Sequence, residues 1–173
     1  LNRKIKAIET IDHKYLSDTC SPADFRDLLI GNYFTKAGRK GKLLILSVSN
    51  ECQLGLRFGM TGRLLIDGSS PIKVLEYSSS KDNSNWVRLS IKFQDGGSLS
   101  IKDPRRLGAA QINPDLCSLG TDLYEITALS LSEALKHSTR PIKARLMDQS
   151  KISGLGNLLT DEISVSYTHL TLP

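Results

Sequence analysis

LMDQSKISGLGNLLTDEI, residues 146–163, is the stretch that says most about this chain. Its spacing predicts a short helix that ends in a glycine-rich turn, followed by a new helix starting near Asn157. Gly154 and Gly156 can adopt positive φ or allow close approach of another backbone, and the first N–H groups of the new helix form an anion site. Such a turn is suited to a phosphate group. Together with the PRR run at residues 104–106, it suggests a nucleic-acid partner.

The composition is that of a globular protein. The 173 residues are 39% apolar and 24% charged, which fits one or two small domains with a buried core and argues against disorder. A net charge of +5 and a pI near 9.2 favour an anionic partner, although many basic proteins bind none.

The sequence predicts neither a metal site nor a membrane segment. Its cysteines and histidines lie far apart without ligand spacing, so neither a zinc cluster nor a disulfide framework is indicated, and a reducing cytoplasm fits best. These residues are Cys20, Cys52, Cys117, His13, His137 and His169. No apolar run is long enough to span a membrane, and the N-terminus has no apolar signal region.

Both ends of the chain are atypical. The chain opens on Leu1, without a methionine, close to a predicted strand over residues 4–11, so we expect a missing upstream segment. After Ile163 the predicted helical pattern ends, and SVSYTHLTLP resembles translated sequencing-adapter read-through. Residues 164–173 are therefore left out of the fold prediction.

The N-terminal part of the chain predicts one helix and several short strands. Ser21 is the expected N-cap, Pro22 takes the first helical position and Asp24 completes a capping box, so a helix should run to about Ile30. Runs of β-forming residues between turn residues predict the strands that follow. These strands cover residues 43–49, 54–58, 63–67, 72–78, 86–93 and 98–102. Together they suggest a two-layer β-sandwich.

Residues 87–93 alternate between apolar and polar. Val87, Leu89, Ile91 and Phe93 should point one way and the intervening polar residues the other, as in a sheet with one buried and one wet face. The polar stretch at residues 78–85 is expected to be an exposed loop.

After Pro114 the apolar period becomes helical. Thr127 is the expected N-cap of one helix, and a second helix with Pro141 in its first turn precedes the glycine turn. We therefore predict a β-sandwich domain over residues 1–113, the first part of a helical domain over residues 114–163, and a non-native tail over residues 164–173.

Five motifs carry a family resemblance. They are GRKGKLLIL from Gly38, GMTGRL from Gly59, DPRRLG from Asp103, LGTDL from Leu119 and RPIKARLMDQSKISGLGN from Arg140. In order and spacing they resemble bacterial formamidopyrimidine-DNA glycosylases and the related endonuclease VIII enzymes, over nearly all of residues 1–163. The resemblance implies an α+β fold, in which a β-sandwich with a flanking helix is followed by the start of a helix-two-turn-helix domain.

The resemblance also implies an activity. The family excises oxidised bases from DNA in base excision repair and then cuts the strand at the abasic site. Its nucleophile is the amine of an N-terminal proline, followed by a catalytic glutamate, and that amine forms a Schiff base with the deoxyribose. By this analogy the chain starts downstream of both residues, so we expect the fragment itself to be inactive.

The family's C-terminal zinc finger would lie beyond Ile163. We therefore expect no cofactor in this chain. Whether the complete protein holds one structural zinc stays an open question, because some relatives have a zincless equivalent.

Lys42 matches the family lysine that contacts the phosphate near the lesion and assists strand cleavage. An ammonium group beside a phosphate stabilises negative charge, and it can transfer a proton if Arg39 and Lys40 lower its pKa. Read alone, Lys42 is a solvated residue in a basic turn.

Met60, Arg105 and Leu107 match the positions from which the family inserts side chains into the duplex after the damaged nucleotide swings out. The apolar side chains would replace lost stacking, and the arginine would bind the estranged base. The family often has phenylalanine at Leu107, so lesion preference is open, although DPRR with the GLGN turn favours 8-oxoguanine and formamidopyrimidines. Taken singly, Met60 and Leu107 read as core residues and Arg105 as a surface arginine.

Arg57, Asn157 and Arg140 complete the predicted DNA contacts. Arg57 stands where the family usually has histidine, and it can bind phosphate in a bidentate manner or be an exposed strand residue. Asn157 and the neighbouring amides would hold phosphates that flank the lesion, unless Asn157 is only a helix cap. Arg140 would add affinity that falls with salt.

The sequence thus predicts a bifunctional DNA glycosylase and abasic-site lyase for the complete protein, acting on double-stranded DNA as a monomer in a bacterial cytoplasm. Two alternatives stay open. One is a non-catalytic, damaged-DNA-binding relative without the proline and glutamate. The other is a structural domain that shares only the sandwich.

Overall fold

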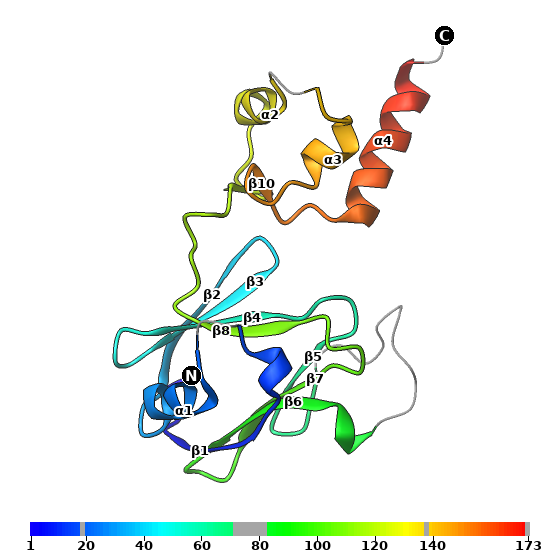
Figure 1. Ribbon diagram of the computed structural model, residues 1–173. Helices are drawn as coiled ribbons and strands as arrows, with labels where there is room; N and C mark the ends of the chain where they lie inside the picture. The colour runs from blue at the N-terminus through cyan, green and yellow to red at the C-terminus, as the bar shows by residue number, and fades with distance from the viewer. Residues whose placement is uncertain (18–19, 71–82, 137–138, 172–173) are drawn as a thin grey trace. The chain divides into compact units, whose positions relative to one another are not determined.

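The computed structural model describes residues 1–17, 20–70, 83–136 and 139–171, and the chain divides into two compact units (Figure 1). The first unit comprises Leu1–Gly38 and Leu43–Pro114, and the second comprises Arg39–Lys42 and Asp115–Pro173. The second unit therefore includes a hairpin turn whose flanking strands lie mainly in the first. Among the described residues no helix has the length and apolarity needed to cross a membrane.

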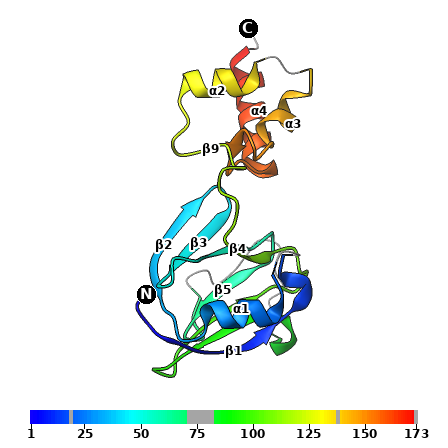
Figure 2. The same ribbon diagram turned by 60° about the vertical axis from the view of Figure 1, so that its left-hand side comes forward.

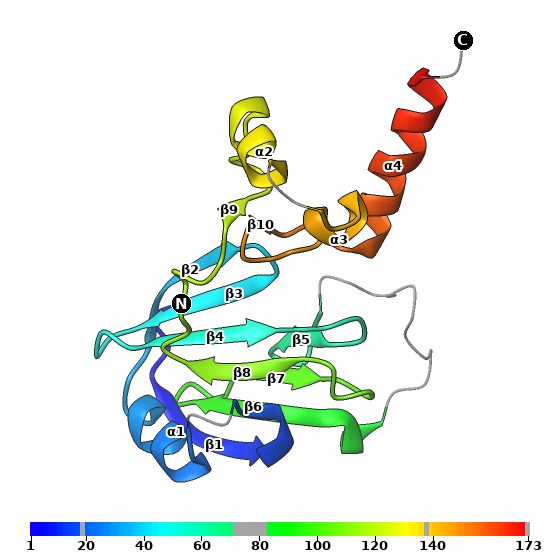
Figure 3. The same cartoon turned by 45° about the horizontal axis from the view of Figure 1, so that its top comes forward.

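The first unit is a sandwich of two four-stranded sheets, as predicted; Figure 3 shows the strands of each sheet side by side. One sheet has the order β1 (Ile5–Ile11), β6 (Val87–Phe93), β7 (Ser98–Lys102) and β5 (Arg63–Ile66). The other has the order β2 (Phe34–Lys40), β3 (Leu43–Val48), β4 (Gln53–Arg57) and β8 (Ala109–Ile112). Short 3₁₀ turns at His13–Tyr15 and Ser84–Trp86 follow β1 and precede β6.

The core of this unit draws apolar side chains from both sheets and from helix α1 (Pro22–Leu29), which packs on β1 (Figure 2). The predicted capping box is confirmed, since the Ser21 side chain accepts from the Asp24 N–H and the Asp24 side chain accepts from the Ser21 N–H. The cap satisfies N–H groups that a helix start leaves unpaired. Phe25 and Leu29 then face the core and are fully buried.

Most predicted strands of the first unit are confirmed, and two strands of this unit were missed. The segments predicted from residues 4, 43, 54, 63, 86 and 98 correspond to β1, β3, β4, β5, β6 and β7, while residues 72–78 lie outside the described part. β2 was missed because its sequence, FTKAGRK, has little apolar alternation and leaves most side chains at least partly exposed at a sheet edge. β8, AAQI, is short and alanine-rich, which gives a weak strand signal.

The predicted wet face at residues 87–93 is wrong where Arg88 and Ser90 lie. Both residues are buried, at 6% and 7% exposure, because the loop after β7 and the turn before β6 cover Arg88, and the Ser90 hydroxyl pairs with Ser100 of β7. Arg88 is hydrogen-bonded to three backbone carbonyls, those of Asp103, Asn85 and Pro104. Alternation reports the polarity of a face and not whether other segments cover it. Of the predicted loop at residues 78–85, the described residues 83–85 are exposed.

The second unit is mainly helical. It contains α2 (Ala128–Leu135), α3 (Ile142–Leu146) and α4 (Asn157–Thr171), with a parallel pair formed by β9 (Thr121–Asp122) and β10 (Ile152–Ser153). Thr127 caps α2 as predicted, because its side chain accepts from the Ser130 N–H. Leu146, Ile152 and Leu155 form a small core.

α4 continues to Thr171, so the prediction that the helical pattern ends at Ile163 is wrong. Residues 164–172 contain neither glycine nor proline, and no helix-stopping residue occurs before Pro173. That residues 164–173 are not native sequence stays a prediction.

Candidate nucleic-acid interface

Two loops of the first unit carry Met60, Arg105 and Leu107. Gly59 has φ of +58°, and a Cβ added there would lie 2.7 Å from the Leu107 Cβ, so the turn around Met60 lies directly against the loop after β7. Met60 and Leu107 are 50% and 47% exposed, which excludes the alternative that they are core residues. The sequence-predicted insertion residues therefore lie on adjoining loops.

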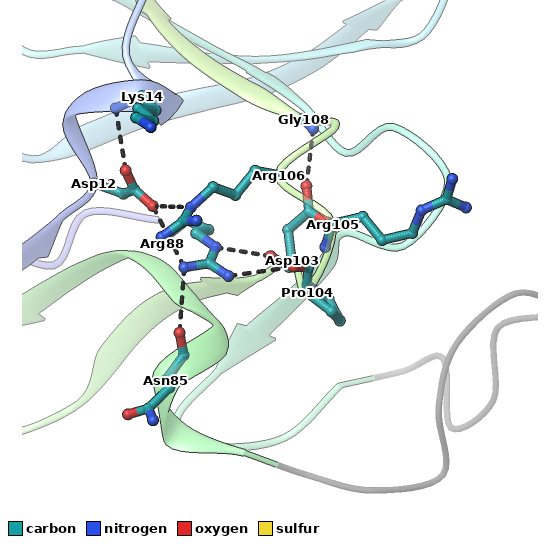
Figure 4. A network of polar contacts seen from close by, with 9 residues as sticks. All are labelled: Asp12, Lys14, Asn85, Arg88, Asp103, Pro104, Arg105, Arg106 and Gly108. Atoms are coloured by element: carbon teal, nitrogen blue, oxygen red, sulfur yellow. Dashed lines mark hydrogen bonds and ion pairs between the residues drawn. The ribbon is translucent and has the colours of Figure 1, made fainter.

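A buried carboxylate joins these loops. Asp103 is fully buried and accepts hydrogen bonds from the Thr61 hydroxyl at 2.6 Å, the Arg105 N–H at 3.2 Å and the Gly108 N–H at 2.8 Å. The Arg105 side chain extends away from this network (Figure 4) and is exposed. An exposed guanidinium on a fixed backbone is available to an external acceptor.

Arg57 ends β4 on the same unit. Its side chain is exposed, and its backbone carbonyl accepts from the Tyr15 hydroxyl at 3.2 Å. Tyr15 is buried, and burial raises the pKa of its hydroxyl well above the ordinary value. A hydrogen bond from a buried side chain thus fixes the backbone at the end of β4, while the Arg57 guanidinium stays accessible.

The glycine turn of the second unit is built around the Leu155 carbonyl. That oxygen accepts from Lys42 Nζ at 2.5 Å and from Gln149 Nε2 at 2.8 Å, and the Gly154 N–H donates to Gln149 Oε1 at 3.1 Å. Gly154 has φ of +111°, and a Cβ added at Gly156 would lie 3.2 Å from Lys42 Nζ. The predicted positive φ is confirmed at Gly154, whereas the group that approaches Gly156 closely is the Lys42 side chain and not the predicted backbone.

Asp122 fixes the turn that carries Lys42. It is buried and accepts from Arg39 through both carboxylate oxygens, at 2.7 and 2.9 Å, and from the Gly41 N–H at 2.6 Å. The Arg39 guanidinium holds the pKa of Asp122 well below its usual range, and it also lies 4.9 Å from the centre of the Tyr124 ring. The carboxylate therefore stays charged and keeps Lys42 beside Leu155.

The pKa of Lys42 is lowered, in the direction predicted, but the cause differs. Desolvation by partial burial lowers it. The predicted perturbers have other partners, because Arg39 is paired with Asp122 and Lys40 Nζ donates to the Leu116 carbonyl at 2.8 Å. The charged form of Lys42 has thus lost part of its hydration.

Asn157 is the first residue of α4 and is exposed. The N–H groups of the first turn of an α-helix have no partner within it, so they and the Asn157 amide can serve an anion. Arg140 is also exposed, and its charge contributes to the lowered pKa of Asp148, which is due first to the Ser150 hydroxyl. Nothing among the described residues groups three or more His, Cys, Asp or Glu side chains as a metal site.

Comparison with known proteins identifies the family. The family profile for the formamidopyrimidine-DNA glycosylase N-terminal domain matches residues 1–110. The chain belongs to the formamidopyrimidine-DNA glycosylase family. It is 34% identical to the formamidopyrimidine-DNA glycosylase of Arabidopsis thaliana and 30% identical to that of Trichormus variabilis, in each case over 94% of this chain.

Solved structures of the family have the same fold. The formamidopyrimidine-DNA glycosylase of Lactococcus lactis, bound non-covalently to DNA containing an abasic site, matches 93% of this chain with a TM-score of 0.72 and 22% identity. A complex of the L. lactis protein with FAPY-dG-containing DNA gives a TM-score of 0.73 at the same identity. The chain spans 45% and 59% of the two curated relatives and about 60% of the solved chains.

Sequence reasoning missed the buried residues that join these loops and fix the turn of Lys42. Asp103 and Thr61 lie inside the quoted motifs DPRRLG and GMTGRL, and Asp122 lies inside LGTDL, yet none was singled out. Each acts through contacts with residues distant in sequence, which spacing does not reveal. The available signal was an isolated aspartate directly before a proline or after a small residue, where carboxylates often accept backbone N–H groups.

Proposed function

We propose that the complete protein is a bifunctional DNA N-glycosylase and abasic-site lyase that excises oxidised bases, 8-oxoguanine and formamidopyrimidines, in base excision repair. The observation that carries this proposal is the turn at Leu155–Asn157 in a chain of this family, where Lys42 Nζ lies against the Leu155 carbonyl at the start of α4. A family relative with FAPY-dG in its bound DNA supports the substrate class.

In this proposal Lys42, Asn157 and Arg140 bind phosphates. A phosphate that accepts from the Lys42 ammonium and from the N–H groups opening α4 receives charge-assisted hydrogen bonds from two directions. Lys42 loses part of its hydration in the free protein, so a bound phosphate restores a favourable environment for its charge. Arg57 contributes a further phosphate contact from the end of β4.

Met60, Arg105 and Leu107 form the proposed wedge. When a damaged nucleotide leaves the stack, the two half-exposed apolar side chains fill the gap and Arg105 hydrogen-bonds the estranged base. Unstacking costs a few kcal/mol, which these contacts offset. Leucine at position 107 covers less of a base than an aromatic ring does.

Borohydride trapping tests the enzymatic proposal. The complete gene product, incubated with an 8-oxoguanine duplex and borohydride, should give a covalent protein–DNA adduct, because borohydride reduces a Schiff base. An undamaged duplex should give none. Selective binding without an adduct on any oxidised base would instead identify a damaged-DNA-binding relative, and binding without lesion preference would leave only the shared fold. The same assay tests the expectation that residues 1–173 alone do not cleave.

Asn157→Ala provides the matched binding test. The variant should bind an abasic-analogue duplex more weakly by about 1–3 kcal/mol, the value of hydrogen bonds to a charged group. Asn50→Ala removes the same amide from an exposed turn of the first unit and should leave binding unchanged. Equal affinities of the two variants would remove Asn157 from the phosphate site.

A further inference from the structure

Resting on the proposed function, we infer that Asp103 and Asp12 are positioning residues that hold the Met60 turn and the Arg105–Leu107 loop as one preorganised wedge. The two loops come from separate parts of the sequence, after β4 and after β7. A wedge that enters a duplex must present all its side chains at once, and any loop freedom would be lost on binding at a cost in affinity.

The first fixing point is the Asp103 carboxylate. One oxygen accepts from the Thr61 hydroxyl and the Arg105 N–H, and the other accepts from the Gly108 N–H. Thr61 belongs to the Met60 turn, and Arg105 and Gly108 flank Leu107, so a single carboxylate joins both loops. Asp103 and Thr61 are 0% and 2% exposed, so water does not replace these bonds.

The second fixing point is Asp12, which acts through two arginines (Figure 4). Arg106 has φ of +53°, a left-handed conformation that is unfavourable for a side chain with a Cβ, and its Nε donates to Asp12 at 2.7 Å. Although partial burial opposes it, hydrogen bonds from Arg106 and the Lys14 N–H keep the pKa of Asp12 below its usual value. The Arg106 side chain is thus directed toward Asp12, and the Arg105 side chain is left pointing outward.

Arg88 connects the two fixing points. Its Nη1 lies 3.4 Å from Asp12, its Nε donates to the Asp103 carbonyl at 2.7 Å, and its Nη2 donates to the Pro104 carbonyl at 3.4 Å. Because this guanidinium is buried and belongs to β6, it holds the Asp103 and Pro104 carbonyls in a fixed position relative to that strand. The loop is therefore held through the Asp103 side-chain carboxylate and through the backbone carbonyls of Asp103 and Pro104.

The test is a binding titration of the full chain with a duplex that contains a tetrahydrofuran abasic analogue opposite 2-aminopurine. The 2-aminopurine fluorescence at saturating protein, called the plateau below, reports stacking around the estranged base. The ratio of Kd values for undamaged and abasic duplexes reports lesion preference. Thr61→Val keeps the side-chain shape and removes the donor. We expect lesion preference to fall about tenfold and the plateau to move toward that of the free duplex. Thr61→Ser, which retains the hydroxyl, should restore both.

Ser90→Ala is the matched control for a general loss of stability. It removes another buried hydroxyl of the first unit, one that pairs with Ser100 within the sheet and not with either loop. Its melting temperature should fall, while its lesion preference and plateau stay at the wild-type values. A Thr61→Val variant with wild-type preference and plateau would overturn the inference.

Asp12→Asn keeps the inference testable if Thr61→Val does not fold. This change weakens the bond to Arg106 without removing a group from the core, and we expect about a threefold loss of lesion preference. Unchanged preference would then overturn the inference. A wild-type chain with no preference for the abasic duplex would instead refute the proposed function, so the two failures are distinguishable.

Discussion

At the residue scale, the surroundings of a side chain decide its chemistry, and adjacent residues of one type can differ completely. Arg105 and Arg106 are neighbours in the DPRR run, yet the first points outward and the second is paired with Asp12. The sequence predicted Arg105 from the family motif. It could not predict the pairing of Arg106, because Asp12 lies 94 positions away.

Lys42 offers a direct test at this scale. Lys42→Met removes the ammonium and keeps a stem of similar length, so affinity for an abasic-analogue duplex should fall about tenfold, or about 1.4 kcal/mol. Lys36→Met removes an exposed lysine from β2 and serves as the control. Fluorescence anisotropy at fixed salt gives both affinities. Equal losses for the two variants would mean that only net charge matters.

At the element scale, local sequence signals predicted the helix caps well, but they did not predict which strand residues other segments cover. The Ser21–Asp24 capping box and the Thr127 cap were readable because all their atoms lie within a few residues. The burial of Arg88 was not readable, since it depends on a loop that follows β7 in sequence and on the strand order of the sheet. Strands with weak periodicity, β2 and β8, form because neighbouring strands supply hydrogen-bond partners.

The β2–β3 turn gives a pH prediction for one element. Because the folded-state pKa of Asp122 lies well below the ordinary value of 3.8, its stabilisation is fully present above about pH 5 and is lost progressively as pH falls through 3.8 toward the folded-state pKa. Asp122→Asn should lower the free energy of unfolding at pH 7 by about 1–3 kcal/mol. Between about pH 5 and pH 3 the free energy of unfolding of the variant should fall less than that of the wild type. Hydrogen exchange of the Gly41 amide, which donates to Asp122, reports the local stability of the turn.

Asp115→Asn is the control for that experiment. Asp115 is an exposed carboxylate of the same unit that accepts only backbone N–H groups of its own turn among the contacts described, those of Cys117 and Ser118. Its replacement should leave Gly41 exchange unchanged at every pH. A wild-type chain whose Gly41 exchange has the same pH dependence as the Asp122→Asn variant would show that Asp122 does not hold the turn.

At the scale of the whole molecule, motif order predicted the family, and the change of apolar period predicted a division after residue 113, while the grouping of residues 39–42 had to come from the structure. Five motifs in sequence were enough to expect the sandwich followed by helices. They did not reveal that residues Arg39–Lys42 group with the second unit, because that grouping depends on the pair between Arg39 and Asp122, 83 positions apart. Long-range ion pairs leave no periodic signal in a sequence.

The last prediction concerns how the net charge of +5 is used. If Lys42 and Arg57 each neutralise a phosphate, the slope of log affinity against log salt should become shallower by about 2 in the Lys42→Met/Arg57→Met double variant. Lys14→Met/Lys36→Met removes the same charge from exposed positions of the first unit and should change the slope little. The change should be equal on undamaged and abasic duplexes, since phosphate contacts carry no base information. Identical slopes for the two double variants would mean that affinity comes from diffuse charge, and Lys42 and Arg57 would then lose their assignment as phosphate ligands.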